Sequence, residues 1–411
     1  MPPTTFFNWF QKTAADLTFL LFSLVTKKNT LQSIVEKPSI NIKIMPSFLL
    51  FAVLALAFAI MMQKLMHFEA SYSSADIGIL SAGLTIVVTG ANSGVGFASA
   101  DHFVQAGAAK VVVMACRNML KCDAARDKIV QKSPDSNTKI IPLELDLASK
   151  ASIEAFASIL PDRLRDLMGE KEGDSIPPID VLMNNAGIFN GSPHKEFIEG
   201  IESHLWVNHL AHVKLTHLLW PNLVEGNGRV VTISSISALL AFSPNNWWFE
   251  DQAVSFSEKW NPVPENLRMY ARSKRANLFF AHELQRRFSP EISAVSSHPG
   301  YSRTEIFMNA AKSTPSWFAK GITKGIATNT YGSMSPADAS LTQVWAAIDH
   351  REIPSGWYVG PKWLTFGEPV AIGPIMNNKT SAHYWPLSLD DSETLWDQSL
   401  KTLGITEFGS V

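Results

Sequence analysis

Tyr270 and Lys274 have the types and the spacing for acid–base chemistry. They form the pattern Y-x-x-x-K within residues 268–288, a segment expected to be helical. Four residues along a helix place both side chains on one face, one turn apart. A phenol with a pKa of about 10 transfers protons poorly at neutral pH unless a cation stabilises its phenolate, and Lys274 can supply that cation. The pair predicts proton transfer to or from an oxygen, although such pairs also arise by chance on surface helices.

Hydroxyl and amide side chains accompany this pair at other predicted strand ends. Ser234 and Ser235 close a strand, where a hydroxyl can bind a substrate carbonyl. Asn208 lies in the segment WVNHLAH, and the segment NNAG (184–187) follows another predicted strand. Because these motifs occur in order, each at a strand end or on a helix, they indicate one active site.

A glycine-rich segment, TGANSGVG (89–96), lies between the first predicted strand and a helix. Its glycines, Gly90, Gly94 and Gly96, would permit a sharp turn, a close approach of phosphate and tight packing of helix on strand. The spacing G-x-x-x-G-x-G differs from the common G-x-G-x-x-G fingerprint, and a plain tight turn is the alternative. The position after a strand and before a helix favours a loop that binds a cofactor pyrophosphate.

The end of the second predicted strand indicates which dinucleotide is bound. A fold that prefers NAD places a carboxylate there for the ribose 2′-hydroxyl. Here the strand ends in Arg117 and Asn118, and no acidic residue occurs between Lys110 and Lys121. A planar guanidinium suits a 2′-phosphate. The sequence therefore predicts NADP(H), with an ordinary surface arginine as the alternative.

Short β-branched runs alternate with amphipathic segments after residue 84. The predicted strands are 84–89, 111–115, 139–143, 181–183, 229–233 and 292–296, and the predicted helices are 97–106, 118–132, 149–168, 197–224 and 268–288. This alternation predicts an α/β fold, a single Rossmann-type doubly wound parallel sheet with helices on both faces. Residues 244–267, rich in proline and tryptophan, interrupt it as an ordered insertion.

As a set, these motifs resemble the short-chain dehydrogenase/reductase family, in its retinol-dehydrogenase-like and WW-domain-oxidoreductase-like branch. The resemblance covers about 84–405 and depends on TGANSGVG (89–96), VVMACRN (112–118), LDL (145–147), NNAG (184–187), VNHLAH (207–212), YARSKRANLFFAHELQRRF (270–288), HPGYSRTEI (298–306) and GWYVGPKWLTFGEPV (356–370). One departure is Ala211, where the family usually has glycine, which should crowd the helix without stopping chemistry.

The resemblance implies a catalytic role for each of four residues. Tyr270 would exchange a proton with the substrate oxygen, and Lys274 would lower the pKa of Tyr270 and bind the nicotinamide ribose. Ser235, preferred to Ser234, would orient the substrate oxygen, and Asn208 would hold a water that links Lys274 to solvent.

The resemblance also implies the residues that contact the cofactor. Asp146 would meet the adenine, Asn184 would support the strands beside the cofactor, and residues 307–331 would form a substrate lid. The expected cofactor-binding set is Gly90, Asn92, Ser93, Gly94, Val95, Gly96, Arg117, Asn118, Asp146, Leu147, Asn184, Ala186, Gly187, Tyr270, Lys274, Pro299, Gly300 and Thr304.

The N-terminal part contains a long apolar run, Phe48–Met62. A helix of that length spans about 22 Å, and extension to 44–66 approaches the roughly 30 Å of a bilayer core. We expect 44–66 to be a membrane anchor, at the endoplasmic reticulum, or a signal-like segment cleaved on targeting, for example to a plastid; a buried helix is the third possibility. Residues 1–43 form an extension before it, 67–83 a linker after it, and 406–411 a tail.

Composition limits the function classes further. The net charge of −2 and the 18% share of charged residues provide no basic face for nucleic acid. The two cysteines, Cys116 and Cys122, are expected to be buried or free thiols, because no second pair suggests a zinc site or a disulfide framework. No metal site is expected.

These observations predict an NADP(H)-dependent oxidoreductase that interconverts a carbonyl and an alcohol on a small lipophilic substrate, such as a retinoid, steroid or lipid. A protochlorophyllide-reductase-like enzyme that reduces a double bond is the nearest alternative. A non-catalytic NADP-binding scaffold at a membrane is another, although such a scaffold has no need for Asn208, Ser235, Tyr270 and Lys274 together. A homodimer is one assembly that the family resemblance allows.

Overall fold

The computed structural model describes residues 74–169, 175–190, 196–241, 265–302, 334–349, 353–362, 367–374 and 389–410. The predicted extension 1–43, the predicted helix 44–66, the substrate lid 307–331 and Thr304 lie outside these residues, as does the insertion up to residue 264. Within the described ranges, no helix has the length and apolar character that a membrane crossing requires.

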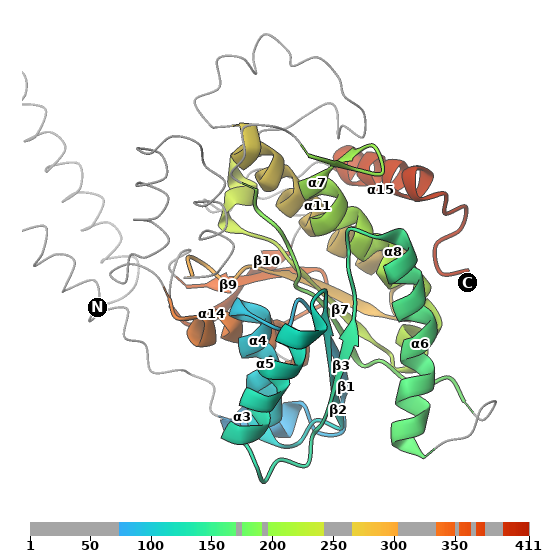
Figure 1. Ribbon diagram of the computed structural model, residues 1–411. Coiled ribbons are helices and arrows are strands. Elements are labelled where there is room, and N and C mark those ends of the chain that lie inside the picture. Colours follow the sequence, from blue (N-terminus) through green and yellow to red (C-terminus); the bar gives the residue numbers. More distant parts are fainter. Residues whose placement is uncertain are drawn as a thin grey trace, which may run out of the picture. The chain divides into compact units, whose positions relative to one another are not determined.

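A single eight-stranded sheet forms the centre of the described part (Figure 1). Its strands are β1 (Thr85–Thr89), β2 (Val111–Cys116), β3 (Lys139–Glu144), β4 (Val181–Asn184), β7 (Arg229–Ile233), β8 (Ser293–Ser297), β9 (Trp357–Pro361) and β10 (Pro369–Pro374). The order across the sheet is β10-β9-β8-β7-β4-β1-β2-β3, and all pairs are parallel except β10 with β9. The prediction of a Rossmann-type, mostly parallel sheet is therefore confirmed, and an antiparallel edge strand is added to it.

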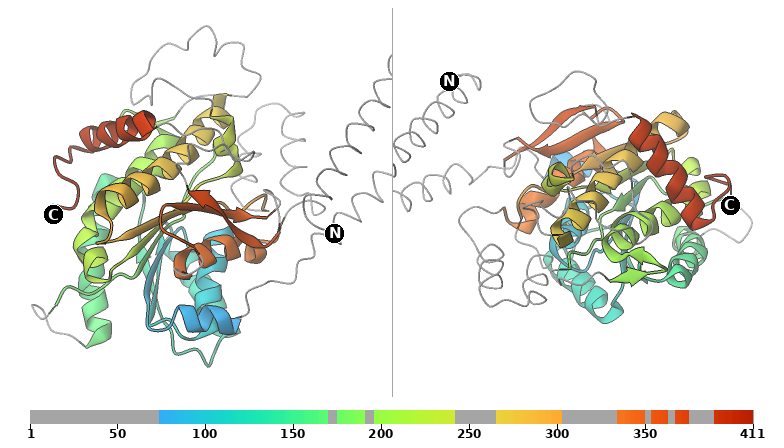
Figure 2. Two further views of the ribbon diagram at one scale, coloured as in Figure 1. Left: turned by 180° about the vertical axis from the view of Figure 1, so that it is seen from behind. Right: turned by 90° about the horizontal axis from the view of Figure 1, so that it is seen from above.

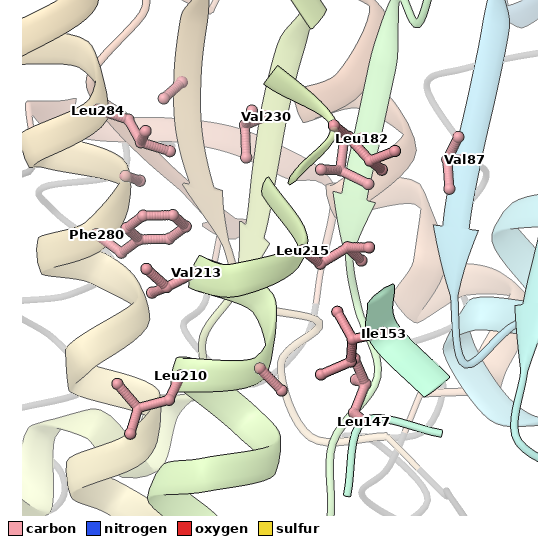
Figure 3. Close-up of a cluster of buried hydrophobic side chains, with 14 of the residues drawn as sticks. Val87, Leu147, Ile153, Leu182, Leu210, Val213, Leu215, Val230, Phe280 and Leu284 are labelled. Carbon is pink, nitrogen blue, oxygen red and sulfur yellow. The ribbon is translucent and has the colours of Figure 1, made fainter. Parts of the chain in front are cut away.

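The strands are apolar along their whole length because both faces of the sheet are covered. Every residue of β1 is buried. Val87 points into one cluster of buried side chains, whereas its neighbours Ile86 and Val88 point into the other. Figure 3 shows the first cluster, in which Val87, Leu182 and Val230 of the sheet face side chains of the covering helices. Burial on both faces explains the continuous Val/Ile runs from which the strands were predicted.

Helices cover both faces of this sheet (Figures 1 and 2). One layer contains α3 (Ser74–Leu80), α4 (Gly94–Ala106), α5 (Met119–Lys132) and α14 (Pro336–Ile348), and the other contains α6 (Lys150–Met168), α8 (Ala211–Leu218) and α11 (Glu265–Phe288). The final helix, α15 (Leu389–Leu403), packs against α11. The expected linker 67–83 is folded in its described part, because α3 buries Ile77 against α4 and α14.

The single helix predicted at 197–224 is wrong. The segment begins as a hairpin of β5 (Phe197–Ile198) and β6 (Ile201–Glu202), which turns through Glu199 and Gly200 at positive φ. After it come α7 (Ser203–Leu205), a π-helical turn, η3 (Trp206–Leu210), then α8 and α9 (Trp220–Glu225). Two consecutive left-handed residues cannot continue a right-handed helix, which explains the break. The π turn places Asn208 within a wider coil of the kind found at functional sites.

The expectation that the two cysteines are thiols is also wrong. Cys116, the last residue of β2, and Cys122, in the first turn of α5, form a disulfide with Cα atoms 6.0 Å apart. Both are buried. No sequence pattern indicated the bond, because the turn from strand to helix is what brings the two residues within reach. The disulfide encloses the turn that carries Arg117 and Asn118.

Candidate active site

The carboxyl ends of the parallel strands surround a cavity of about 700 Å³. This is the edge of an open α/β sheet at which ligands usually bind. Most of the predicted site residues line it; of those that the structure describes, Asn184 and Asn208 do not. The lining residues from that set are Gly90, Asn92, Ser93, Gly94, Val95, Gly96, Arg117, Asn118, Asp146, Leu147, Ala186, Gly187, Ser235, Tyr270, Lys274, Pro299 and Gly300.

The glycine-rich loop joins β1 to α4 along one side of the cavity. Gly94 has a φ of +57°, a left-handed conformation that suits glycine. A Cβ at Gly96 would collide with the side chain of Asn185 and lie 2.5 Å from the carbonyl oxygen of Gly90. The loop therefore packs too tightly for any side chain at residue 96. It leaves the amino end of α4 facing the cavity, where backbone N–H groups and the helix dipole favour a phosphate.

Thr89, which was not among the residues predicted from the sequence, is buried and holds this loop through hydrogen bonds. Its Oγ1 accepts the backbone N–H groups of Asn185 and Ala186, both at 2.9 Å. The side-chain amide of Asn185 donates to the carbonyl oxygen of Thr89 at 2.8 Å, and Gln343 of α14 donates to Oδ1 of Asn185 at 3.1 Å. The loops after β1 and β4 are thus held together by hydrogen bonds. The polar residue that ends the apolar run of β1 was the signal that could have revealed Thr89.

The turn after β2 presents two cations to the cavity. Arg117 is exposed, and both Arg117 and Lys121 line the cavity wall. Asn118 caps α5, since its Oδ1 accepts the backbone N–H of Lys121 at 3.0 Å. Asp146 follows β3, and its Oδ1 accepts the backbone N–H of Ala148 at 3.0 Å. One of its two carboxylate oxygens is therefore engaged in a local hydrogen bond. This donor set, with no carboxylate on the β2 turn, fits a nucleotide that carries a 2′-phosphate.

Tyr270 and Lys274 lie one turn apart on α11, and both line the cavity. They are almost entirely buried, with 6% and 3% of their surfaces exposed. The Nζ of Lys274 donates to the carbonyl oxygen of Ile233 at 3.1 Å and lies 5.8 Å from the centre of the Tyr270 ring. A Cβ at Gly187 would stand 3.1 Å from that Nζ and 3.1 Å from Oδ1 of Asn208, so a larger side chain at residue 187 would press on both groups.

Burial shifts the pKa values of this pair toward their neutral forms. It raises the pKa of Tyr270 to about 12, against the opposing effect of a hydrogen bond with Ser235. It lowers the pKa of Lys274 to about 8. At neutral pH the phenol therefore keeps its proton and Lys274 is mostly a cation, an arrangement that is ready to donate a proton.

The two serines after β7 have different partners. Ser235 is the one hydrogen-bonded to Tyr270, and its Oγ also accepts the N–H of Ser237 at 3.2 Å. Ser234 is buried, and its hydroxyl donates to the carbonyl oxygen of Lys274 at 2.8 Å. Ser235 therefore lies beside the phenol, whereas Ser234 links the end of β7 to α11 through a hydrogen bond.

Asn184 and Asn208 are buried behind the cavity wall. The amide of Asn184 donates to Oγ1 of Thr216 on α8 at 3.1 Å. Oδ1 of Asn208 accepts the N–H of Ile188 at 2.7 Å, and its Nδ2 donates to the carbonyl oxygen of Ile188 at 3.1 Å and to Oγ of Ser273 at 2.9 Å. Both donors of Asn208 are thus engaged within the protein. In this structure the two side chains hold β4 against α8 and the segment after β4 against α11 through hydrogen bonds.

Comparison with known proteins places this geometry in a family. A family model described as short chain dehydrogenase matches residues 84–246. Human retinol dehydrogenase 12 is 30% identical over 322 residues, which cover 77% of this chain and 88% of that protein. The WW domain-containing oxidoreductase of Gallus gallus is 35% identical over 224 residues, which cover 53% of this chain and 49% of that protein.

A solved structure agrees with these relatives. The crystal structure of an uncharacterized protein from Mycobacterium paratuberculosis is 27% identical, has a TM-score of 0.53, and covers 82% of this chain and 98% of its own. Sequence, fold and the cavity at the sheet edge thus agree. The chain belongs to the short-chain dehydrogenase family of oxidoreductases, in its retinol-dehydrogenase-like branch.

Proposed function

We propose that this chain is an NADP(H)-dependent oxidoreductase that interconverts a carbonyl and an alcohol on a small lipophilic substrate. The observation that carries the proposal is a buried phenol, Tyr270, hydrogen-bonded to Ser235 and one helical turn from Lys274, beside a cavity at the carboxyl edge of the sheet. Relatives named retinol dehydrogenase 12 and 14 support a retinoid-like substrate.

The residues of the chain divide the reaction between them. Bound NADPH would supply the hydride that forms the new C–H bond at the carbonyl carbon. Ser235 would orient the carbonyl oxygen by a hydrogen bond, and Tyr270 would transfer its hydroxyl proton to that oxygen. Lys274 would stabilise the phenolate that remains, because its ammonium lies 5.8 Å from the centre of the Tyr270 ring, one turn along α11. In the reverse direction the same phenolate would accept the alcohol proton.

Turnover with a panel of carbonyl compounds tests this function. The full chain, purified in detergent, would be mixed with NADPH and with retinal, a steroid ketone, a long-chain aldehyde or a conjugated alkene. We expect NADPH oxidation that depends on a carbonyl compound and yields the alcohol. A product with a reduced C=C bond and an intact carbonyl would indicate a double-bond reductase. Tight NADPH binding without any turnover would indicate a scaffold.

Replacing Arg117 by Ala tests the choice of cofactor. A charge-assisted hydrogen bond to a phosphate contributes about 1.5–3 kcal/mol, so we expect the Kd for NADPH to rise by roughly tenfold to a hundredfold. The Kd for NADH, which lacks the 2′-phosphate, should stay within about threefold. Arg126→Ala, further along α5 and paired with Asp127, is the matched control. Equal losses for both cofactors would exclude a contact between Arg117 and a 2′-phosphate.

A further inference from the structure

The segment Ile188–Asn190, which follows β4 and lines the cavity, is held at both ends by buried side chains. Asn208 binds both the N–H and the carbonyl oxygen of Ile188, at 2.7 and 3.1 Å. Nε2 of His204 accepts the backbone N–H of Asn190 at 2.9 Å. The amide of Asn266, at the start of α11, reaches the carbonyl oxygen of Asn190 at 3.4 Å. The backbone on either side of Phe189 is therefore fixed.

Phe189 itself packs against Tyr270. The two ring centres are 5.0 Å apart, and the ring of His204 lies 6.0 Å from that of Phe189. His204 also faces the Tyr270 ring edge-on at 6.1 Å. Phe189 and Tyr270 both line the cavity, whereas His204 does not. His204 thus contacts the cavity wall through these two rings and the backbone of Asn190.

The hydrogen-bond geometry fixes which ring nitrogen of His204 carries the proton. A backbone N–H can only donate, so Nε2 must be the acceptor and Nδ1 must carry the proton. Nδ1 donates to Oε1 of Glu202 at 2.7 Å. The second carboxylate oxygen of Glu202 accepts the N–H groups of His204 and Leu205, at 3.1 and 3.3 Å. Glu202 thus caps α7 and orients the histidine at the same time.

We propose that His204, oriented by Glu202, is a positioning residue of the active site that holds Phe189 against Tyr270 and thereby shapes the substrate wall. The inference rests on the proposed function, in which Tyr270 is the acid. The contact with Phe189 shields the phenol from water, and burial is the cause of the raised Tyr270 pKa. The same ring presents an apolar surface to the substrate. These contacts of His204 are with Asn190, Glu202, Phe189 and Tyr270 and involve neither the glycine-rich loop nor Arg117. We therefore expect NADPH binding to be independent of His204.

A pair of substitutions in the full chain separates positioning from simple folding. His204→Leu removes the acceptor, whereas the Oε1 of His204→Gln can still accept the Asn190 N–H. With the best carbonyl substrate, we expect His204→Leu to raise KM about tenfold, as loss of one buried hydrogen bond implies, and to leave the Kd for NADPH within about twofold. His204→Gln should return KM to within about threefold of the original chain.

The matched control is His217→Leu. Nδ1 of His217 accepts a backbone N–H, from Gly409 at 3.1 Å, in a bond of the same type that does not touch the cavity. This variant should leave KM unchanged. A KM that rises equally in the Leu and Gln variants of His204, or in the His217 control, would overturn the proposal.

Amide hydrogen exchange provides a readout that does not depend on turnover. The Asn190 amide should be protected in the original chain and in His204→Gln, and should exchange at least tenfold faster in His204→Leu, with global unfolding unchanged. Unchanged protection in His204→Leu would refute the positioning role. Failure of the proposed function would give a different result. The Asn190 amide would still lose its protection in His204→Leu, but neither the original chain nor any variant would reduce a carbonyl.

Discussion

Replacing Tyr270 by Phe is expected to lower kcat for carbonyl reduction by about three orders of magnitude, because a positioned general acid contributes typically 10²–10⁴-fold. The substitution deletes one hydroxyl and keeps the buried ring, which packs against Phe189. The cofactor loop, held by Thr89 and Asn185, makes no use of the phenol. The Kd for NADPH should therefore stay within about twofold.

Steady-state kinetics and a separate measurement of NADPH binding by fluorescence would check this result. Ser235→Ala is an informative companion, since it leaves the phenol but removes its hydrogen-bond partner. It should lower kcat by roughly tenfold to a hundredfold, less than the loss of Tyr270 itself. A Tyr270→Phe chain that kept a tenth or more of the original kcat would remove Tyr270 from the chemistry.

Mild acid is expected to destabilise the folded chain by about 6 kcal/mol between pH 7 and pH 5. Three fully buried histidines are the cause: burial lowers the pKa of His209 to about 4 and those of His212 and His298 to about 3. In the unfolded chain each would titrate near its ordinary value of about 6.5. Stability is therefore fully present above about pH 6.5 and is lost as the pH falls toward the folded values, because only the unfolded chain takes up the protons.

Denaturant unfolding at pH 7, 6 and 5 would measure this loss. Each histidine accounts for about 2 kcal/mol of it, so His209→Gln should reduce the difference between pH 7 and pH 5 by about one third. His209 contacts Ser399 and Phe280, away from the cavity. A difference below about 1 kcal/mol in the original chain would contradict the prediction.

The sheet could be predicted from the sequence because its signal is local. Each of the predicted strands at 84–89, 111–115, 139–143, 181–183, 229–233 and 292–296 lies within one residue of an observed strand. Burial on both faces requires long apolar runs, which are visible in the sequence. β9 and β10 were not predicted: β10 begins and ends with proline and lies at the edge of the sheet, where the apolar signal is weakest.

The candidate site was only partly predictable. The glycine-rich loop, Tyr270 and Lys274 form local motifs, and the structure gathers them around one cavity. Thr89 and Asn185 bond each other across 96 residues of chain, so no local pattern could show their part in holding the loop. His204 is similar, because its importance depends on the backbone of Asn190 and on a tautomer fixed by Glu202.

The Cys116–Cys122 disulfide turns the end of β2 and the start of α5 into a covalently closed ring. Inside this ring, the cap at Asn118 and the bond itself set the path of the backbone, while the side chain of Arg117 is exposed and held by neither. The residues that determine the backbone path of this turn are therefore different from the residue that gives it its charge, and each can change in evolution without the other. If Arg117 has the role proposed for it, its exchange for a carboxylate would weaken binding of the 2′-phosphate without rebuilding the strand or the helix.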